Sequence, residues 1–304
     1  MGDNFGQYAD SVQGADVSFL KSGRSLSRWG VSQLQLEQTI LQEGFDGGAG
    51  FAHGVTDPGL TSVLMQVTEF DDRVLLDGTP FPSRMLVVLP PGCHFNFVRT
   101  GPVSWFSWSM RKDDELATRL TGKATRSAGK TDKSIIVTTD ETAGRLRKIV
   151  NGAFSAGRTA PLELVERELF NELESAWKER PDVINLPSEH TRLAERIVVS
   201  ALRYAQLKYG ENVLISELVE NESVGYRTLL RAFERYIHFS PKHYLKLRQL
   251  NAVYHAIRKN NGFERLTDIL GEQGVNEFGR FAGEYRAIFA ELPSDTYRRH
   301  RPGL

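Results

Sequence analysis

The chain has 304 residues, in which 38 lysine and arginine residues balance 38 aspartate and glutamate residues, and 40% of its residues are hydrophobic. This length and apolar content are sufficient for two domains, each with its own core. The single cysteine, Cys93, excludes an internal disulfide and a multi-cysteine zinc site, and we expect it to be a small buried side chain.

The chain contains no run of 18 apolar residues that would cross a membrane as a helix. Its first residues also lack the basic and then apolar pattern of a signal segment. We therefore expect a cytoplasmic protein with no membrane partner.

Residues 1–30 form a candidate N-terminal arm in which basic residues precede an aromatic one. Arg24 and Arg28 lie four positions apart, Lys21 adds a further charge and Trp29 adds a flat ring. Guanidinium groups bind phosphate oxygens or the Hoogsteen edge of guanine, and their planes stack on aromatic rings. The arm therefore fits a ligand that carries both phosphates and guanines, and the alternative is a basic arm that remains in solvent.

Residues 31–135 contain short segments of β character that are separated by glycine and proline. The expected strands are residues 33–41, 61–67, 73–76, 85–89, 94–98 and 103–109. Many short strands with turns between them predict a sandwich or a barrel. Residues 1–185 hold only His53 and His94, without a His-x-His pair, so we expect neither a catalytic metal site nor an enzyme.

Residues 136–185 read as two helices that flank residues 157–161. In the second helix the apolar positions repeat with a spacing typical of coiled coils, at Leu162, Val165, Leu169, Leu173, Ala176 and Trp177. One interpretation is a helical hairpin that packs within the chain. The other is a homodimer seam, which is favoured because two-fold operators call for two-fold proteins.

Residues 186–304 contain one apolar pattern twice, 52 positions apart. The positions are Leu214, Leu218, Leu229, Phe233, Ile237 and Pro241 in the first copy, and Leu266, Leu270, Phe281, Tyr285, Phe289 and Pro293 in the second. Each copy predicts a short helix, a turn and a longer helix with one apolar face. This organisation is a tandem helix-turn-helix, joined by an expected helix over residues 241–258.

The outer face of each longer helix is a candidate surface for reading the major groove of DNA. The first helix offers Arg227, Thr228, Arg231 and Arg235, and the second offers Arg280 and Arg286. Arginine binds guanine or phosphate through two parallel hydrogen bonds, so we expect the first copy to specify sequence and the second to anchor. The alternative is an ordinary solvated helix face.

The same residues resemble a known family. The resemblance is carried by Arg231-Ala-Phe233, Phe239-Ser-Pro-Lys-His-Tyr244, Arg248, Gly274, Phe281, Tyr285-Arg286 and Glu291-Leu-Pro-Ser294. Over residues 190–300 the chain resembles the DNA-binding domain of AraC/XylS-type transcription regulators. The resemblance implies an α+β protein in which a cupin-like β-barrel binds a small effector, and a bipartite helix-turn-helix domain binds promoter double-stranded DNA.

The whole-chain organisation, with an Arg-x-x-x-Arg segment before the barrel, is similar to a cyclic di-GMP-responsive branch of that family. That resemblance implies that Arg24 and Arg28 share cyclic di-GMP with the barrel, so that the ligand favours the dimer and DNA binding. Candidate barrel contacts are Arg84, His94, Asn96 and Arg99, chosen for their polarity. No metal or other cofactor is expected, and RNA polymerase is a partner if the protein activates. The alternatives are a non-nucleotide effector or a cupin enzyme.

Overall fold

The computed structural model describes residues 5–25, 28–67, 73–122, 133–179, 183–184, 189–208, 211–260 and 264–300. The chain divides into two compact units. Unit 1 comprises Met1–Ser18, Ser27–Gly47 and Ala52–Pro187, and unit 2 comprises Phe19–Leu26, Gly48–Phe51 and Ser188–Leu304. The predicted α+β fold is confirmed, because the strands gather in the first part of the chain and helices form its last part. The expected boundary at residues 185–186 lies outside the described residues.

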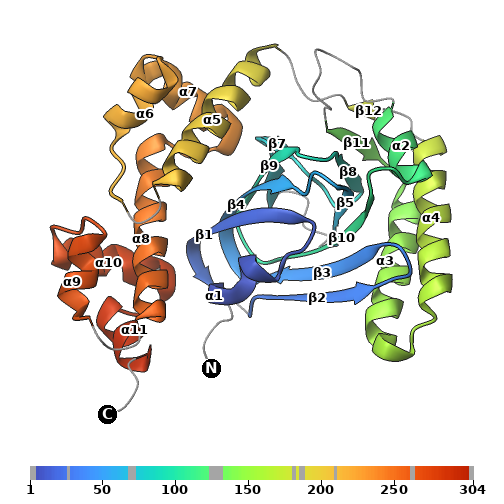
Figure 1. Cartoon of the computed structure of the whole chain (residues 1–304), viewed down its shortest axis with the longest axis horizontal. Coiled ribbons are helices and arrows are strands. Elements are labelled where there is room, and N and C mark those ends of the chain that lie inside the picture. Colours follow the sequence, from blue (N-terminus) through green and yellow to red (C-terminus); the bar gives the residue numbers. More distant parts are fainter. Residues whose placement is uncertain are drawn as a thin grey trace. The chain divides into compact units, whose positions relative to one another are not determined.

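Unit 2 contains the two predicted helix-turn-helix copies. Its helices are α5 (Glu189–Leu207), α6 (Ile215–Glu222), α7 (Tyr226–Ile237), α8 (Pro241–Lys259), α9 (Leu266–Glu272), α10 (Phe278–Phe289) and α11 (Pro293–His300). Within this unit, α8 runs between the pair α6–α7 and the pair α9–α10 (Figure 1). The apolar repeat faces inward as predicted, since Leu218, Leu229 and Phe233 are fully buried. Leu214 is the exception, because it precedes α6 as its N-cap residue and is 53% exposed.

No helix in the described part of the chain has the length and apolar character that crossing a bilayer requires.

Unit 1 contains most of two β-sheets that curl around a common interior (Figure 1). The smaller sheet has the order β1 (Ala15–Ser25), β4 (Gly48–Thr56), β9 (His94–Arg99), β6 (Val74–Leu76) and β7 (Thr79–Pro80). The larger sheet has the order β12 (Val183–Ile184), β11 (Ser134–Val137), β8 (Met85–Leu89), β5 (Leu60–Gln66), β10 (Val103–Arg111), β3 (Ile40–Asp46) and β2 (Gly30–Gln35). Every pairing in the larger sheet is antiparallel.

One strand prediction was wrong, and the strands β1 and β4 were not predicted. Residues 33–41 form the end of β2 and the start of β3, because the Leu36 N–H bonds the Thr39 carbonyl and closes a tight turn. β1 lies in the expected arm. β4 was missed because it is rich in glycine, which disfavours strands. Its glycines have a packing reason, since a Cβ at Gly50 or Gly54 would overlap the ring of Phe19 or Phe95.

The predicted helical hairpin is formed by α3 (Asp140–Ala156) and α4 (Leu162–Glu179). Thr139 caps α3, because its hydroxyl accepts a hydrogen bond from the Thr142 N–H. The apolar seam of α4 packs into the core that covers the outer face of the larger sheet, and Val165, Leu169 and Leu173 are at most 7% exposed. The seam is therefore used within the chain, and a homodimer requires another surface.

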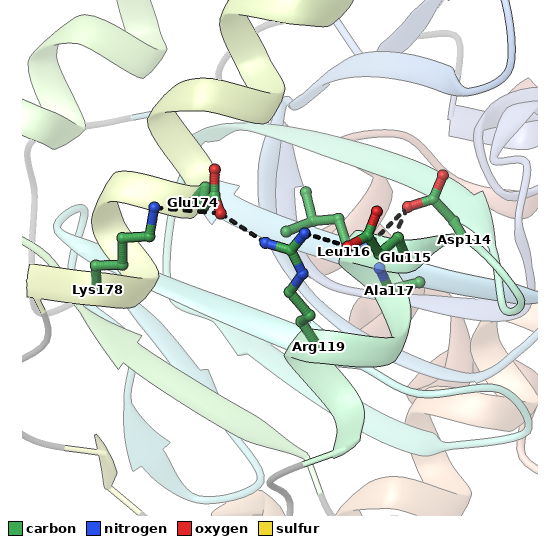
Figure 2. A network of polar contacts seen from close by, with 7 residues as sticks. All are labelled: Asp114, Glu115, Leu116, Ala117, Arg119, Glu174 and Lys178. Carbon is green, nitrogen blue, oxygen red and sulfur yellow. Dashed lines mark hydrogen bonds and ion pairs between the residues drawn. The ribbon is translucent and has the colours of Figure 1, made fainter.

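Helix α2 (Glu115–Gly122) is connected to α4 by the polar contacts drawn in Figure 2. Arg119 pairs with Glu115 on its own helix and with Glu174 on α4, and Lys178 lies 3.2 Å from Glu174. Asp114 accepts hydrogen bonds from the backbone at the start of α2. Because Arg119, Glu115 and Lys178 are exposed, solvent weakens each pair, and the contacts orient α2 more than they stabilise it.

A buried carboxylate attaches α4 to the turn between β2 and β3. Glu166 is 6% exposed and accepts hydrogen bonds from the Thr39 hydroxyl and the Gln38 N–H. The Thr39 hydroxyl in turn accepts from Trp108 Nε1 at 2.7 Å. Since a buried charge is tolerated only when its hydrogen bonds are made, this chain of contacts fixes where the helical hairpin meets the sheet.

We predict that Glu166→Ala lowers the free energy of unfolding by about 2 kcal/mol, because it leaves the Thr39 hydroxyl and the Gln38 N–H without their acceptor. Chemical denaturation of the full chain measures this loss. The control is Glu168→Ala on the same helix, where the side chain is exposed and its removal changes stability by less than about 0.5 kcal/mol. Equal effects of the two substitutions would contradict the role given to Glu166.

Candidate DNA interface and effector site

The outer face of α7 carries a row of exposed basic side chains. Arg227, Arg231 and Arg235 are exposed at spacings of four residues, and the Thr228 hydroxyl lies beside them. The opposite face is buried. No ion pair involves these three arginines in the part of the chain that the structure describes. The row therefore presents three guanidinium groups along about 12 Å of helix.

Helix α10 has a different outer face. Arg280 is exposed but lies 3.2 Å from Glu284 and 3.8 Å from Glu277, so its charge is offset on its own helix. Arg286 is exposed at the last turn. Gly279 and Gly283 are also exposed, and a Cβ at either position would have no neighbour within 4 Å. No contact within the described chain explains these glycines, whose helical cost is about 1 kcal/mol each.

Two adjacent residues of α8, Arg248 and Gln249, form hydrogen bonds to the backbone beside the two helix-turn-helix copies. Arg248, which is 8% exposed, donates to the carbonyls of Lys208 and Glu211, where α5 ends. Gln249 donates through Nε2 to the carbonyls of Gln273 and Gly274, where α9 ends, at 2.9 and 3.1 Å. Both side chains thus satisfy carbonyls that a helix end leaves open. Within unit 2, α8 therefore fixes the arrangement of the α5–α7 group and the α9–α10 group.

In each copy, the first helix is followed by a residue with left-handed backbone conformation, but the residue type differs between the copies. Ser223 (φ 50°) ends α6 in the left-handed region, and Gly274 (φ 70°) occupies that region after α9. Only the second position requires glycine for space, since a Cβ at Gly274 would lie 2.7 Å from the Cβ of Asn212. Asn212 precedes α6, so this close approach is a further contact between the two copies within unit 2.

The four arm residues proposed for effector binding divide into buried and exposed pairs. Lys21 is 2% exposed, and in unit 2 its backbone N–H and carbonyl both pair with the Asn251 side chain of α8 at 3.0 Å. Trp29 is 1% exposed in unit 1. Arg24 in β1 and Arg28 before β2 are exposed. Only the two arginines therefore present their side chains to solvent.

Of the four proposed barrel residues, Arg84 is exposed and two others belong to one polar cluster. His53 Nδ1 lies 3.0 Å from Asn96 Oδ1, and the His53 and His94 rings are stacked at 6.1 Å. Asn96 also donates from its backbone and its side chain to Asp77. Burial lowers the pKa of His53 to about 4, so this ring is neutral at pH 7.

The fourth barrel residue, Arg99, forms a buried ion pair with Asp46. Burial raises the pKa of Asp46 to about 6, and the charge of Arg99 and a hydrogen bond from Trp105 oppose this rise. Asp46 had no signal in the sequence, because its nearest partner in sequence, Tyr8, is 38 residues away. In the described part of the chain, no three His, Cys, Asp or Glu side chains gather as a metal site would require.

Comparisons with known proteins point to transcription regulators. No family model matches the chain. The XylDLEGF operon transcriptional activator of Pseudomonas putida is 31% identical over 105 residues, covering 34% of this chain and 32% of that protein. The probable thc operon regulatory protein of Rhodococcus erythropolis is 29% identical over 103 residues, covering 34% and 31%. The chain thus spans about a third of the length of the curated relatives it matches.

Two solved structures resemble the chain over most of its length. The AraC-like transcriptional activator CuxR is 14% identical, with a TM-score of 0.41, and the match covers 82% of this chain and 90% of that one. ToxT from Vibrio cholerae O395 is 9% identical, with a TM-score of 0.31, and the match covers 96% and 100%.

The exposed glycines of α10 yield a prediction in which stability and binding change in opposite directions. Gly279→Ala and Gly283→Ala each raise the free energy of unfolding by up to about 1 kcal/mol, because alanine favours the helix. Each also weakens DNA binding, because the new methyl group holds the helix away from the duplex backbone. Denaturation measures the first effect, and fluorescence anisotropy with DNA selected by the full chain from a random library measures the second.

Gly144→Ala is the matched control, since Gly144 lies in α3 and a Cβ there would also have no neighbour within 4 Å. It gains similar stability and leaves DNA affinity unchanged. Unchanged DNA affinity in both α10 variants would remove the reason given for their glycines.

Proposed function

We propose that this chain is a member of the AraC/XylS family of transcription regulators and a sequence-specific regulator that binds promoter double-stranded DNA. The observation that carries the proposal is the row of exposed, unpaired arginines on α7 opposite a fully packed face. An ordinary solvated helix face places acidic partners beside its arginines at i+3 or i+4, as α10 does at Arg280. On α7 only Glu234, three residues after Arg231, occupies such a position, and the two form no ion pair in the described chain, so the row suits an external polyanion.

The two copies have different tasks in this proposal. Arg227, Arg231 and Thr228 read base edges or phosphates from the first major groove, where guanine O6 and N7 match the arginine fork. Helix α10 offers fewer unpaired charges, and its glycines bring the backbone close to the second groove. The 19 residues of α8 extend about 28 Å, which suits two reading helices roughly one DNA turn of 34 Å apart.

Substitution of the α7 arginines tests this interface. Arg227→Ala and Arg231→Ala each weaken binding to selected DNA roughly tenfold to a hundredfold, because each removes a two-pronged contact. Fluorescence anisotropy at several salt concentrations measures both the affinity and its salt dependence. Where the substituted arginine binds a phosphate, the slope of log Kd against log salt also decreases by about one.

Lys148→Ala on α3 is the control, because it removes an exposed positive charge from a helix outside the proposed interface. Its affinity and salt slope equal those of the wild type. If the α7 variants behave like this control, α7 does not bind DNA.

The proposed effector is cyclic di-GMP, which offers two phosphates and two guanines to Arg24 and Arg28. Both arginines are exposed. Arg84 is a further exposed contact in this proposal, whereas His94, Asn96, Arg99, Lys21 and Trp29 contribute only if their internal contacts rearrange. The ligand binds these residues and no metal or other cofactor takes part.

In this proposal, the route from effector to DNA runs inside unit 2. The strand segment that carries Arg24 belongs to that unit, and its Lys21 backbone is paired with Asn251. Asn251 lies three residues after Arg248 on α8, the helix that fixes the two copies. A ligand that shifts this strand segment changes the equilibrium of α8, and couplings of this kind are typically about 1–3 kcal/mol. The same effector favours a cytoplasmic homodimer, which recruits RNA polymerase if the protein activates.

Calorimetric titration with cyclic di-GMP tests the effector. Arg24→Ala and Arg28→Ala each weaken binding at least about tenfold, since each removes a charge-assisted contact to phosphate or guanine. Lys112→Ala, at an exposed lysine after β10, retains the affinity of the wild type.

Wild-type affinity in both arginine variants would contradict the site. If cyclic di-GMP leaves the melting temperature of the wild type unchanged and a sugar, an amine or another metabolite raises it, the second candidate applies. That candidate is a regulator of the same family with a non-nucleotide effector.

A further inference from the structure

The N-terminal helix of unit 1 buries two aromatic side chains. Helix α1 (Phe5–Tyr8) has only 4 residues, and Phe5 and Tyr8 are each 3% exposed. Both rings meet the Trp29 indole edge-on, with centroids 5.3 and 5.2 Å away. A helix of this length is not stable by itself, so these side chains hold it in place.

The Tyr8 side chain lies in a buried site, here called the cradle, that is formed by Asp46, Trp105 and Trp29. Its hydroxyl donates to Asp46 Oδ1 and accepts from Trp105 Nε1 at 2.8 Å. Asp46 is fully buried, and its other oxygen pairs with Arg99 Nε. One hydroxyl thus meets both an acceptor and a donor, so its hydrogen-bonding capacity is used in both directions.

The cradle is built to keep this geometry. A Cβ at Gly44 would lie 2.2 Å from the Trp105 ring, so only glycine lets the indole lie against β3 and aim Nε1 at Asp46. The Trp105 nitrogen also lies 3.2 Å from Asp46 Oδ1. No local sequence pattern indicates this contact, because Tyr8 and Trp105 are 97 residues apart.

The chemistry of the cradle selects its occupant. Asp46 repels a carboxylate, and the Asp46–Arg99 pair already balances its own charge, so a neutral group is favoured. An ammonium group donates to Asp46 but cannot accept from Trp105 Nε1, and an ether accepts from Trp105 Nε1 but cannot donate to Asp46. The flat surface of Trp29 suits an aromatic ring. A phenol meets all these conditions, and its para substituent would leave along the path of α1.

We propose that the cradle of Asp46, Trp105 and Trp29 is a binding site for para-substituted phenols, which the chain itself fills with Tyr8. A phenolic ligand displaces α1 by taking the place of the Tyr8 side chain. Displacement stops at Gln13, whose backbone N–H and carbonyl are both held by the Gln42 side chain at 2.7 and 2.9 Å. Its test uses neither DNA nor cyclic di-GMP, so its failure and the failure of the proposed function are distinguishable.

The full-length Tyr8→Ala variant tests the site, with 4-methylphenol as the probe because it reproduces the missing side chain. The probe raises the melting temperature of the variant and binds it at least about tenfold more tightly than the wild type, where Tyr8 competes at a high effective concentration. Toluene and 4-methylanisole are the matched probes. They lack the donated hydrogen bond and bind the variant at least about tenfold more weakly.

Two results overturn the proposal. Equal affinity of the three aromatic probes would reveal an unspecific apolar cavity, and equal affinity of 4-methylphenol for variant and wild type would place its binding elsewhere. If Tyr8→Ala does not fold, Tyr8→Phe takes its place, because it keeps the ring and loses only the hydroxyl. Then 4-methylphenol binds Tyr8→Phe more tightly than the wild type, and equal affinity for the two again overturns the site.

Discussion

The hydrogen bonds of α8 beside both helix-turn-helix copies are the constraint on which unit 2 depends. Arg248 and Gln249 are neighbours in sequence, yet one holds the end of α5 and the other the end of α9. Each uses backbone carbonyls, which stay in place when surface side chains change. The spacing of the two outer faces is therefore set by partly buried hydrogen bonds, while the faces themselves remain available for sequence recognition.

Arginine serves two purposes in this chain, and burial separates them. Arg99 and Arg248 are buried, and each has its charge paired or its donors used within the protein. Arg227 and Arg231 are exposed on a helix whose other face is fully packed. Stability does not explain the exposed arginines, because exposed charges contribute little to the free energy of unfolding. Their arrangement is explained by an external partner of opposite charge, as the proposed function requires.

Local periodicity predicted unit 2 well and unit 1 only in part. The apolar repeat indicates α6, α7, α9 and α10 because each residue's burial follows from helical spacing alone. β4 escaped detection because its glycines accommodate rings from other strands. The pairing of Lys21 with Asn251 spans 230 positions, and no local pattern encodes it. Local helical spacing was enough to predict the exposed arginines of α7. The contacts of Arg248 and Gln249 on α8 and the cradle around Tyr8 join residues that are distant in sequence, so they were not predicted.

Hydroxyl-radical footprinting of the full chain on DNA selected from a random library tests the central claim most directly. Because α8 fixes both copies, the account predicts two protected patches per bound protein, about one helical turn (~10 base pairs) apart on one face of the duplex. Inserting half a turn (about 5 base pairs) between the patches abolishes one of them. A single patch on the original DNA, or two patches that tolerate the insertion, would contradict the account.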